Sequence, residues 1–259
     1  MDITQTPSPN FNMRKHKLDM LVLHYTGMAT GEEALERMCD PAAEVSAHYM
    51  VWEDGRITQL VDEDKRAWHA GVASWQGQQD LNSRSIGIEI VNGGHDFPLP
   101  DGGLPPYPRP QIHALLDLVH DILGRHDIPA TRILGHSDIA PLRKQDPGEH
   151  FPWERLARAG ISLWPEFDGT TKEIIGKGLE RGTSGSSDDD LQSSADGVLR
   201  VLCHCFRSAM SGQNPRLECH SKLGQDICSR FHDGPIRLTS HRNTDKDLLV
   251  AGHVLRSGS

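Results

Sequence analysis

Three polar residues stand at or just beyond the ends of apolar segments that we expect to be strands. His24 lies in the apolar run 20–25, His136 follows a second apolar run, and Asp146 lies in a loop before Pro147. Two imidazoles and one carboxylate, with a fourth position left for water, are a ligand set of catalytic zinc sites. Zinc in such a site lowers the pKa of water toward about 7 and so generates a nucleophile. The alternative for each histidine alone is a core or edge residue with partners inside the fold.

A carboxylate, Glu89, interrupts the expected strand 85–91 between isoleucines at positions 86, 88 and 90. Side chains alternate between the two faces of a strand, so Glu89 points away from these isoleucines. Simple exposure to solvent would explain the pattern, because burying an unpaired carboxylate is costly. The functional interpretation places Glu89 in a partly dry cleft beside a metal, where its pKa would suit general-base catalysis.

Lys144 stands two residues before Asp146. If the loop is extended there, the two side chains point the same way and an ammonium group reaches the metal site. Such a cation could stabilise a developing oxyanion. The alternative is an ordinary surface lysine.

The elements that would position these residues follow from hydrophobic periodicity. Apolar runs rich in strand formers predict five strands, at 20–25, 48–52, 56–61, 85–91 and 131–134. Glu53-Asp-Gly55 between the second and third predicts a hairpin turn. Apolar residues with a 3.6-residue period predict a helix from Pro110 to a stop before Pro129, and a short helix is expected over 152–159. This alternation predicts an α/β fold, with a sheet covered by helices.

The two ends of the 259-residue chain differ in composition. Residues 1–167 hold all five tryptophans, all three tyrosines and the whole net charge of −9. We therefore expect an extension over 1–17, one main domain over 18–167, a Gly/Ser/Asp-rich linker over 168–197 and a weakly structured tail over 198–259. A structural zinc site in the tail is an alternative, but the spacing of its cysteines fits no common zinc finger.

Charge and hydropathy exclude several classes of partner. A chain with a net charge of −9 has nothing with which to neutralise nucleic-acid phosphates, so we expect no nucleic-acid partner. The longest apolar run is far short of the roughly 20 residues that span a bilayer. No apolar export signal is visible near the N-terminus, and only Cys39 lies in the main domain, which favours a reducing compartment. We expect a monomer in the cytoplasm, with the periplasm as the alternative.

Six segments carry a resemblance to a known family, in the order LVLHYTG, SAHYMV, AWHAGVASWQG, SIGIEI, GHSDIAP and RKQDPG. In this order they resemble the N-acetylmuramoyl-L-alanine amidases of the second amidase family, over roughly residues 18–167. The segments WHAGVASWQG and HFPWERLARAGISLWP are most similar to the AmiD-type branch. The resemblance implies a central mixed β-sheet flanked by helices on both faces, as in the related peptidoglycan recognition proteins.

The resemblance also implies roles for individual residues. The family's zinc ligands fall on His24, His136 and Asp146, its catalytic glutamate on Glu89 and its transition-state lysine on Lys144. Its substrate groove falls on five further positions, Tyr49, Trp68, His69, Ala70 and Asn92. The implied activity is hydrolysis of the amide between N-acetylmuramic acid, or its anhydro form, and L-alanine in peptidoglycan fragments, with one Zn²⁺ per chain.

Two features depart from the AmiD-type pattern. Those enzymes usually carry an export signal, and they often carry a C-terminal peptidoglycan-binding module, of which residues 199–208 resemble one helix only faintly. We expect disorder or a degenerate module in the tail, with a folded binding module as the alternative. The alternative function is a non-catalytic peptidoglycan-binding receptor on the same fold, although such proteins typically lose a zinc ligand. A zinc peptidase is disfavoured because the chain has no HExxH segment.

Overall fold

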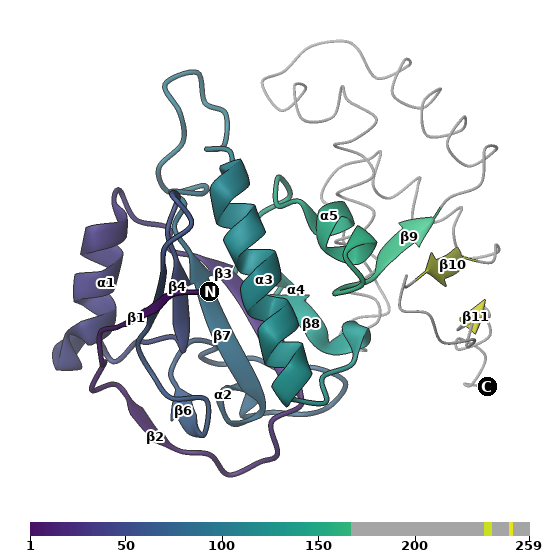
Figure 1. Ribbon diagram of the computed structural model, residues 1–259, viewed down its shortest axis with the longest axis horizontal. Coiled ribbons are helices and arrows are strands. Elements are labelled where there is room, and N and C mark those ends of the chain that lie inside the picture. The colour runs from purple at the N-terminus through teal and green to yellow at the C-terminus, as the bar shows by residue number, and fades with distance from the viewer. Residues whose placement is uncertain (167–235, 240–248, 251–259) are drawn as a thin grey trace.

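A mixed six-stranded β-sheet forms the centre of the molecule (Figure 1). The computed structural model describes residues 1–166, 236–239 and 249–250. Across the sheet the strands follow the order β1-β5-β4-β7-β3-β8, and neighbours run parallel except for β4 and β5. The strands are β1 (Ile3–Gln5), β3 (Met20–Tyr25), β4 (Tyr49–Val51), β5 (Ile57–Gln59), β7 (Ser85–Ile90) and β8 (Ile133–Gly135).

The register of the central strands decides which side chains share a face. β3 and β7 are parallel, and His24 lies directly opposite Glu89. On the other side of β7, Met50 of β4 lies opposite Glu89 and Tyr49 lies opposite Ile88. Because side chains alternate along each strand, His24 and Glu89 share one face of the sheet and Tyr49 lies on the other.

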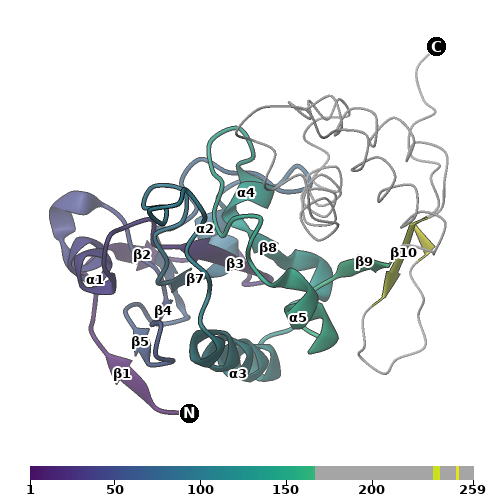
Figure 2. The ribbon, with the colours of Figure 1, turned by 90° about the horizontal axis from the view of Figure 1, so that it is seen from above.

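One face of the sheet is covered by α3 (Arg109–Arg125) and α5 (Trp153–Arg158), and Figure 2 shows α3 along this side. α3 presents a fully buried stripe to the sheet, formed by Ile112, Leu115, Leu118, Val119 and Ile122. The stripe packs on the isoleucines of β7 and on Leu21 and Leu23 of β3. Burying each such side chain contributes roughly 1.5–3 kcal/mol, so this layer is the main core.

The opposite face is covered by three shorter helices, α1 (Gly31–Cys39), α2 (Leu81–Arg84) and α4 (His136–Ile139). The Thr30 side chain caps α1 by accepting a hydrogen bond from the Glu33 N–H at 3.2 Å. Ala34 and Met38 of α1 pack with Met50 of β4. The expected fold, a mixed sheet with helices on both faces, is confirmed.

The remaining described elements lie outside this central sheet and its two layers of helices. β2 (Phe11–Met13) pairs with β6 (Lys65–Ala67), and two 3₁₀ turns occur at η1 (Pro41–Ala43) and η2 (Ala130–Arg132). A separate three-stranded sheet is formed by β9 (Trp164–Glu166), β10 (Ile236–Thr239) and β11 (Leu249–Val250). Among the described residues, no helix combines the length and the apolar character needed to cross a membrane.

The strands expected at 20–25 and 85–91 and the long helix are confirmed to within one or two residues, apart from an earlier end of the helix at Arg125. The last predicted strand begins two residues late, at Ile133, because Ala130–Arg132 close a 3₁₀ turn. The extension 1–17 contributes β1 to the central sheet and so belongs to the fold. The linker and most of the tail lie outside the described residues.

A half-buried carboxylate links the end of α3 to the loop after β5. Glu63 accepts hydrogen bonds from the Tyr49 hydroxyl at 2.7 Å, Arg125 at 2.7 Å and His126 at 2.6 Å. Burial alone raises the pKa of Glu63, but these three donors outweigh it and hold the pKa at about 2. A folded-state pKa below the ordinary value means that ionised Glu63 stabilises the fold.

We expect this stabilisation to be complete above pH 4.5 and to be lost as the pH falls from 4.5 toward 2. Glu63→Gln should lower the free energy of unfolding at neutral pH by about 2 kcal/mol, after allowing for the partly exposed Arg125. Urea denaturation of both proteins across this pH range measures the difference. If the difference in free energy of unfolding between the two proteins stays constant from pH 7 to pH 2.5, ionised Glu63 does not stabilise the fold in this way.

Candidate metal centre and active site

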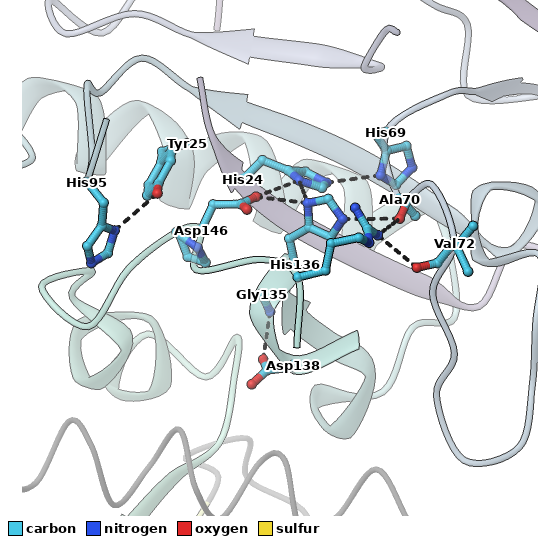
Figure 3. Close-up of polar contacts among 12 residues, drawn as sticks. His24, Tyr25, His69, Ala70, Val72, His95, Gly135, His136, Asp138 and Asp146 are labelled. Atoms are coloured by element: carbon cyan, nitrogen blue, oxygen red, sulfur yellow. Dashed lines mark hydrogen bonds and ion pairs between the residues drawn. The ribbon is translucent and has the colours of Figure 1, made fainter. Parts of the chain in front are cut away.

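His24, His136 and Asp146 meet at the carboxyl-terminal ends of β3 and β8 (Figure 3). The Nδ1 atoms of the two histidines lie 3.0 Å apart, and Asp146 Oδ2 lies 2.9 Å from one and 3.0 Å from the other. All three side chains are buried. Among the described residues they are the group of three whose donor atoms could hold one metal ion.

The hydrogen bonds of His136 fix which of its ring nitrogens is free. Its Nε2 atom lies 3.1 Å from the carbonyl oxygen of Ala70, which can only accept. Nε2 therefore carries the proton in the neutral ring, and Nδ1 keeps its lone pair toward His24 and Asp146. Such an arrangement, in which a carbonyl orients a metal-binding imidazole, is typical of metal sites.

The three donor atoms suit a divalent cation. Two neutral imidazole nitrogens with lone pairs repel each other and a carboxylate at 3.0 Å unless a cation lies between them. Burial and the neighbouring His136 lower the pKa of His24 to about 4, so this ring is neutral at neutral pH. The pKa of Asp146 is also lowered: burial raises it, but the hydrogen bonds of His136 and His24 outweigh that effect. The donor set of neutral N, neutral N and anionic O fits Zn²⁺.

Glu89 lies beside this triad on the same face of the sheet. Its Oε2 atom is buried and has no hydrogen-bond partner among the described residues. Burial raises the pKa of Glu89 well above its ordinary value, the charge of Asp146 raises it further, and the ammonium of Lys144 lowers it. Simple exposure of this carboxylate is therefore not what the structure shows, because one of its oxygens is buried and the side chain is only partly accessible.

Lys144 follows a turn in which its backbone N–H donates to the Ala140 carbonyl at 3.0 Å. Its positive charge lowers the pKa of both Glu89 and His24. The cation thus acts electrostatically on the carboxylate and on the metal-facing imidazole. The site combines three potential metal ligands with a carboxylate and a cation.

Comparison with known proteins identifies the family. Residues 14–149 match the family model described as N-acetylmuramoyl-L-alanine amidase, which is more than half of the chain. The chain belongs to this amidase family. The family is zinc-dependent in general, in agreement with the triad of donor atoms.

Individual relatives agree with this assignment. The chain is 40% identical over 168 residues to the N-acetylmuramoyl-L-alanine amidase AmiD of Escherichia coli. The aligned region covers 62% of this chain and 60% of AmiD. It is 35% identical to the 1,6-anhydro-N-acetylmuramyl-L-alanine amidase AmpD of Haemophilus influenzae, with 60% of this chain and 90% of AmpD covered. The crystal structure of AmpDh3 from Pseudomonas aeruginosa with anhydromuramic pentapeptide is 38% identical, has a TM-score of 0.53, and covers 72% of this chain and 74% of that one.

The five positions that the amidase resemblance assigns to the substrate groove do not lie together. Tyr49 is buried in the core under α3, on the opposite face of the sheet, and its hydroxyl donates to Glu63. This geometry does not fit a groove residue. The resemblance could not reveal this, because it carries no information on which face of β4 a side chain occupies. Asn92 holds the loop after β7, through Gly94 N–H at 2.8 Å and the Pro105 carbonyl at 2.9 Å.

The other three positions lie in the segment beside the metal-binding triad. Trp68 is partly exposed, and its buried indole Nε1 has no partner among the described residues. His69 and Ala70 are buried, and each contacts one of the two histidines of the triad, at His24 Nε2 and His136 Nε2 respectively. Their polar atoms are thus directed at the histidines of the amidase site.

Two residues of the amidase site were not singled out from the sequence. Arg143 donates to the carbonyl oxygens of Ala70 at 3.1 Å and Val72 at 2.8 Å, and so ties the two loops beside the triad. Ser85 lies on the same face of β7 as Glu89 and contacts His69. The strand alternation that predicted the direction of Glu89 also applies to Ser85, four residues earlier.

Proposed function

We propose that this protein is a zinc-dependent N-acetylmuramoyl-L-alanine amidase acting in peptidoglycan turnover. The observation that carries the proposal is the buried triad of His24, His136 and Asp146 beside the unpaired carboxylate of Glu89. The names of the relatives supply the bond: AmiD and AmpD are amidases of N-acetylmuramyl-L-alanine and of its 1,6-anhydro form. The aligned segment spans only 60% of AmiD, so the activity of the whole chain is argued from its own site.

One Zn²⁺ per chain would be held by His24 Nδ1, His136 Nδ1 and one Asp146 oxygen. When bound, it would supply Lewis acidity to the amide carbonyl and lower the pKa of water in the site. The protein's own contribution is to hold the two imidazoles in the tautomer that leaves Nδ1 free, as the Ala70 carbonyl does for His136.

Glu89 is the group proposed to move the proton. Its carboxylate takes a proton from the attacking water, and later returns it to the alanine nitrogen as the amide C–N bond breaks. Its raised pKa, caused mainly by burial, makes the carboxylate basic enough to take that proton. Lys144 provides the positive charge that stabilises the oxyanion formed on the carbonyl oxygen.

The reaction products distinguish an amidase from a peptidoglycan-binding receptor and from a zinc peptidase that cleaves within the peptide. With an anhydromuramyl peptide as substrate, we expect mass spectrometry to show a lactyl-bearing anhydro sugar and a free peptide that begins with L-alanine. Intact ligand after prolonged incubation with the zinc-loaded protein would favour the receptor. Cleavage within the peptide would favour the peptidase.

We propose soluble muropeptide fragments as the substrate, processed by a monomer in the cytoplasm. The support is electrostatic: residues 1–167 carry the entire net charge of −9, and this acidic domain is repelled by an anionic wall. At low salt, kcat/KM on soluble muropeptide should exceed release from intact sacculi by on the order of tenfold, or about 1.4 kcal/mol. Equal rates on both, or a tagged protein found mainly in the periplasm, would contradict this assignment.

A further inference from the structure

His69 lies beside the imidazole of His24, on the side away from Asp146 (Figure 3). Its Nδ1 is 3.0 Å from His24 Nε2, and its Nε2 is 3.1 Å from the Ser85 hydroxyl. The two rings meet edge to face, with centroids 5.1 Å apart. Both nitrogens of His69 are engaged inside the protein, so neither is directed at a substrate.

His24, His69, Ser85 and the Leu81 carbonyl form a row of hydrogen bonds, and the carbonyl at its end fixes the direction of each one. The Leu81 carbonyl oxygen, 2.6 Å from the Ser85 hydroxyl, can only accept, so Ser85 donates to it. Ser85 has one hydroxyl proton, and its oxygen therefore accepts from His69 Nε2–H. His69 Nδ1 is then an acceptor, and it takes the proton of His24 Nε2–H. This order leaves His24 Nδ1 without a proton, facing Asp146 Oδ2 at 2.9 Å.

The ring of His69 is also held in place by its surroundings. Its backbone N–H donates to Asn82 Oδ1 at 3.0 Å. The ring packs flat against β7 at Gly87, where a Cβ atom would lie 2.4 Å from His69 Cγ. Glycine at this position therefore makes room for the imidazole under the metal-binding triad.

We propose that His69 is a positioning residue that fixes the tautomer and orientation of His24 for zinc, through the chain Leu81–Ser85–His69–His24. The proposal rests on the proposed zinc site. Outer-shell partners of this kind typically change metal affinity by about 10- to 100-fold when they are removed. In this role His69 contacts no substrate and no reacting atom.

The test is the zinc affinity of full-length variants, measured by competition with a chromophoric chelator. His69→Phe removes the acceptor but fills the space, and we expect it to bind zinc about 10- to 100-fold more weakly than the wild type. His69→Asn places a carbonyl oxygen close to the position of Nδ1, and it should restore most of the affinity. A role in packing alone would give the opposite order, since Asn fills the space less well than Phe.

Ser85→Ala and Ser83→Ala form a matched pair, because both serines are fully buried and only Ser85 contacts His69. Ser85→Ala should weaken zinc binding, and Ser83→Ala should not. Unchanged affinity in both His69→Phe and Ser85→Ala, or an equal loss in His69→Phe and His69→Asn with none in Ser85→Ala, would overturn the proposal. A wild-type protein that binds no zinc would instead overturn the proposed function.

Discussion

Asp146→Asn should remove zinc from the protein and reduce turnover on the order of 10³-fold or more. The substitution keeps the shape of a side chain that is buried between two histidines, but it removes the negative charge. A catalytic metal supplies several kcal/mol of transition-state stabilisation, and each 1.4 kcal/mol corresponds to about tenfold in rate. Elemental analysis should give about one zinc per chain for the wild type and almost none for the variant.

Asp138→Asn is the matched control for this experiment. Asp138 is equally buried and lies close by, but it accepts the Gly135 N–H at 2.7 Å and is directed away from the triad (Figure 3). This variant should keep its zinc. Chelator treatment of the wild type should abolish activity, and added Zn²⁺ should restore it. Normal zinc content in Asp146→Asn would remove this residue from the ligand set.

The sequence predicts the central part of this fold well, because the signal there is strong. β3 begins with the apolar run Met20–Leu23, and the isoleucines of β7 alternate with Ser85, Gly87 and Glu89. Alternation alone therefore predicts that Glu89 leaves the core face. The parallel register of β3 and β7 then brings Glu89 opposite His24, which no local pattern could establish.

Elements at the edges of the fold were missed for a physical reason. β1, β2 and β6 have three residues each, too few to show a periodicity, and they exist through pairing with distant strands. α1 has a capping threonine and an amphipathic pattern, but only Ala34, Met38 and Gly31 are buried. Its signal is weaker than that of α3, which buries a complete apolar stripe.

The predicted site differs from the structure where a residue's role depends on how deeply its side chain is buried. A histidine next to a tryptophan in WHAG is compatible with a groove wall and with a buried support, and the sequence does not distinguish them. In the structure His69 lies under the triad with 6% of its surface exposed, while Tyr49 lies in the other layer. The structure brings His24, His136 and Asp146 together, as the sequence predicts, and their assignment as zinc ligands stays a prediction.

Glu89→Gln should retain the fold and about one zinc per chain, yet lose activity by roughly 10²–10⁴-fold, the usual contribution of a positioned general base. The amide has nearly the same shape and adds no charge that must be desolvated, so zinc content and thermal stability should change little. It cannot take a proton from water. Glu89 has no hydrogen-bond partner at Oε2 among the described residues, so the substitution breaks no contact there.

The pH profile provides a second measurement of the same role for Glu89. Burial raises the pKa of this carboxyl, Asp146 raises it further and Lys144 lowers it, so the base form is lost as the pH falls through that raised value. The acidic limb of kcat should therefore be present in the wild type and absent from the residual activity of Glu89→Gln. Glu63→Gln, which changes a half-buried carboxylate away from the triad, should keep both kcat and the acidic limb. A Glu89→Gln variant that retains most of its kcat with zinc bound would show that the proton is taken by another group.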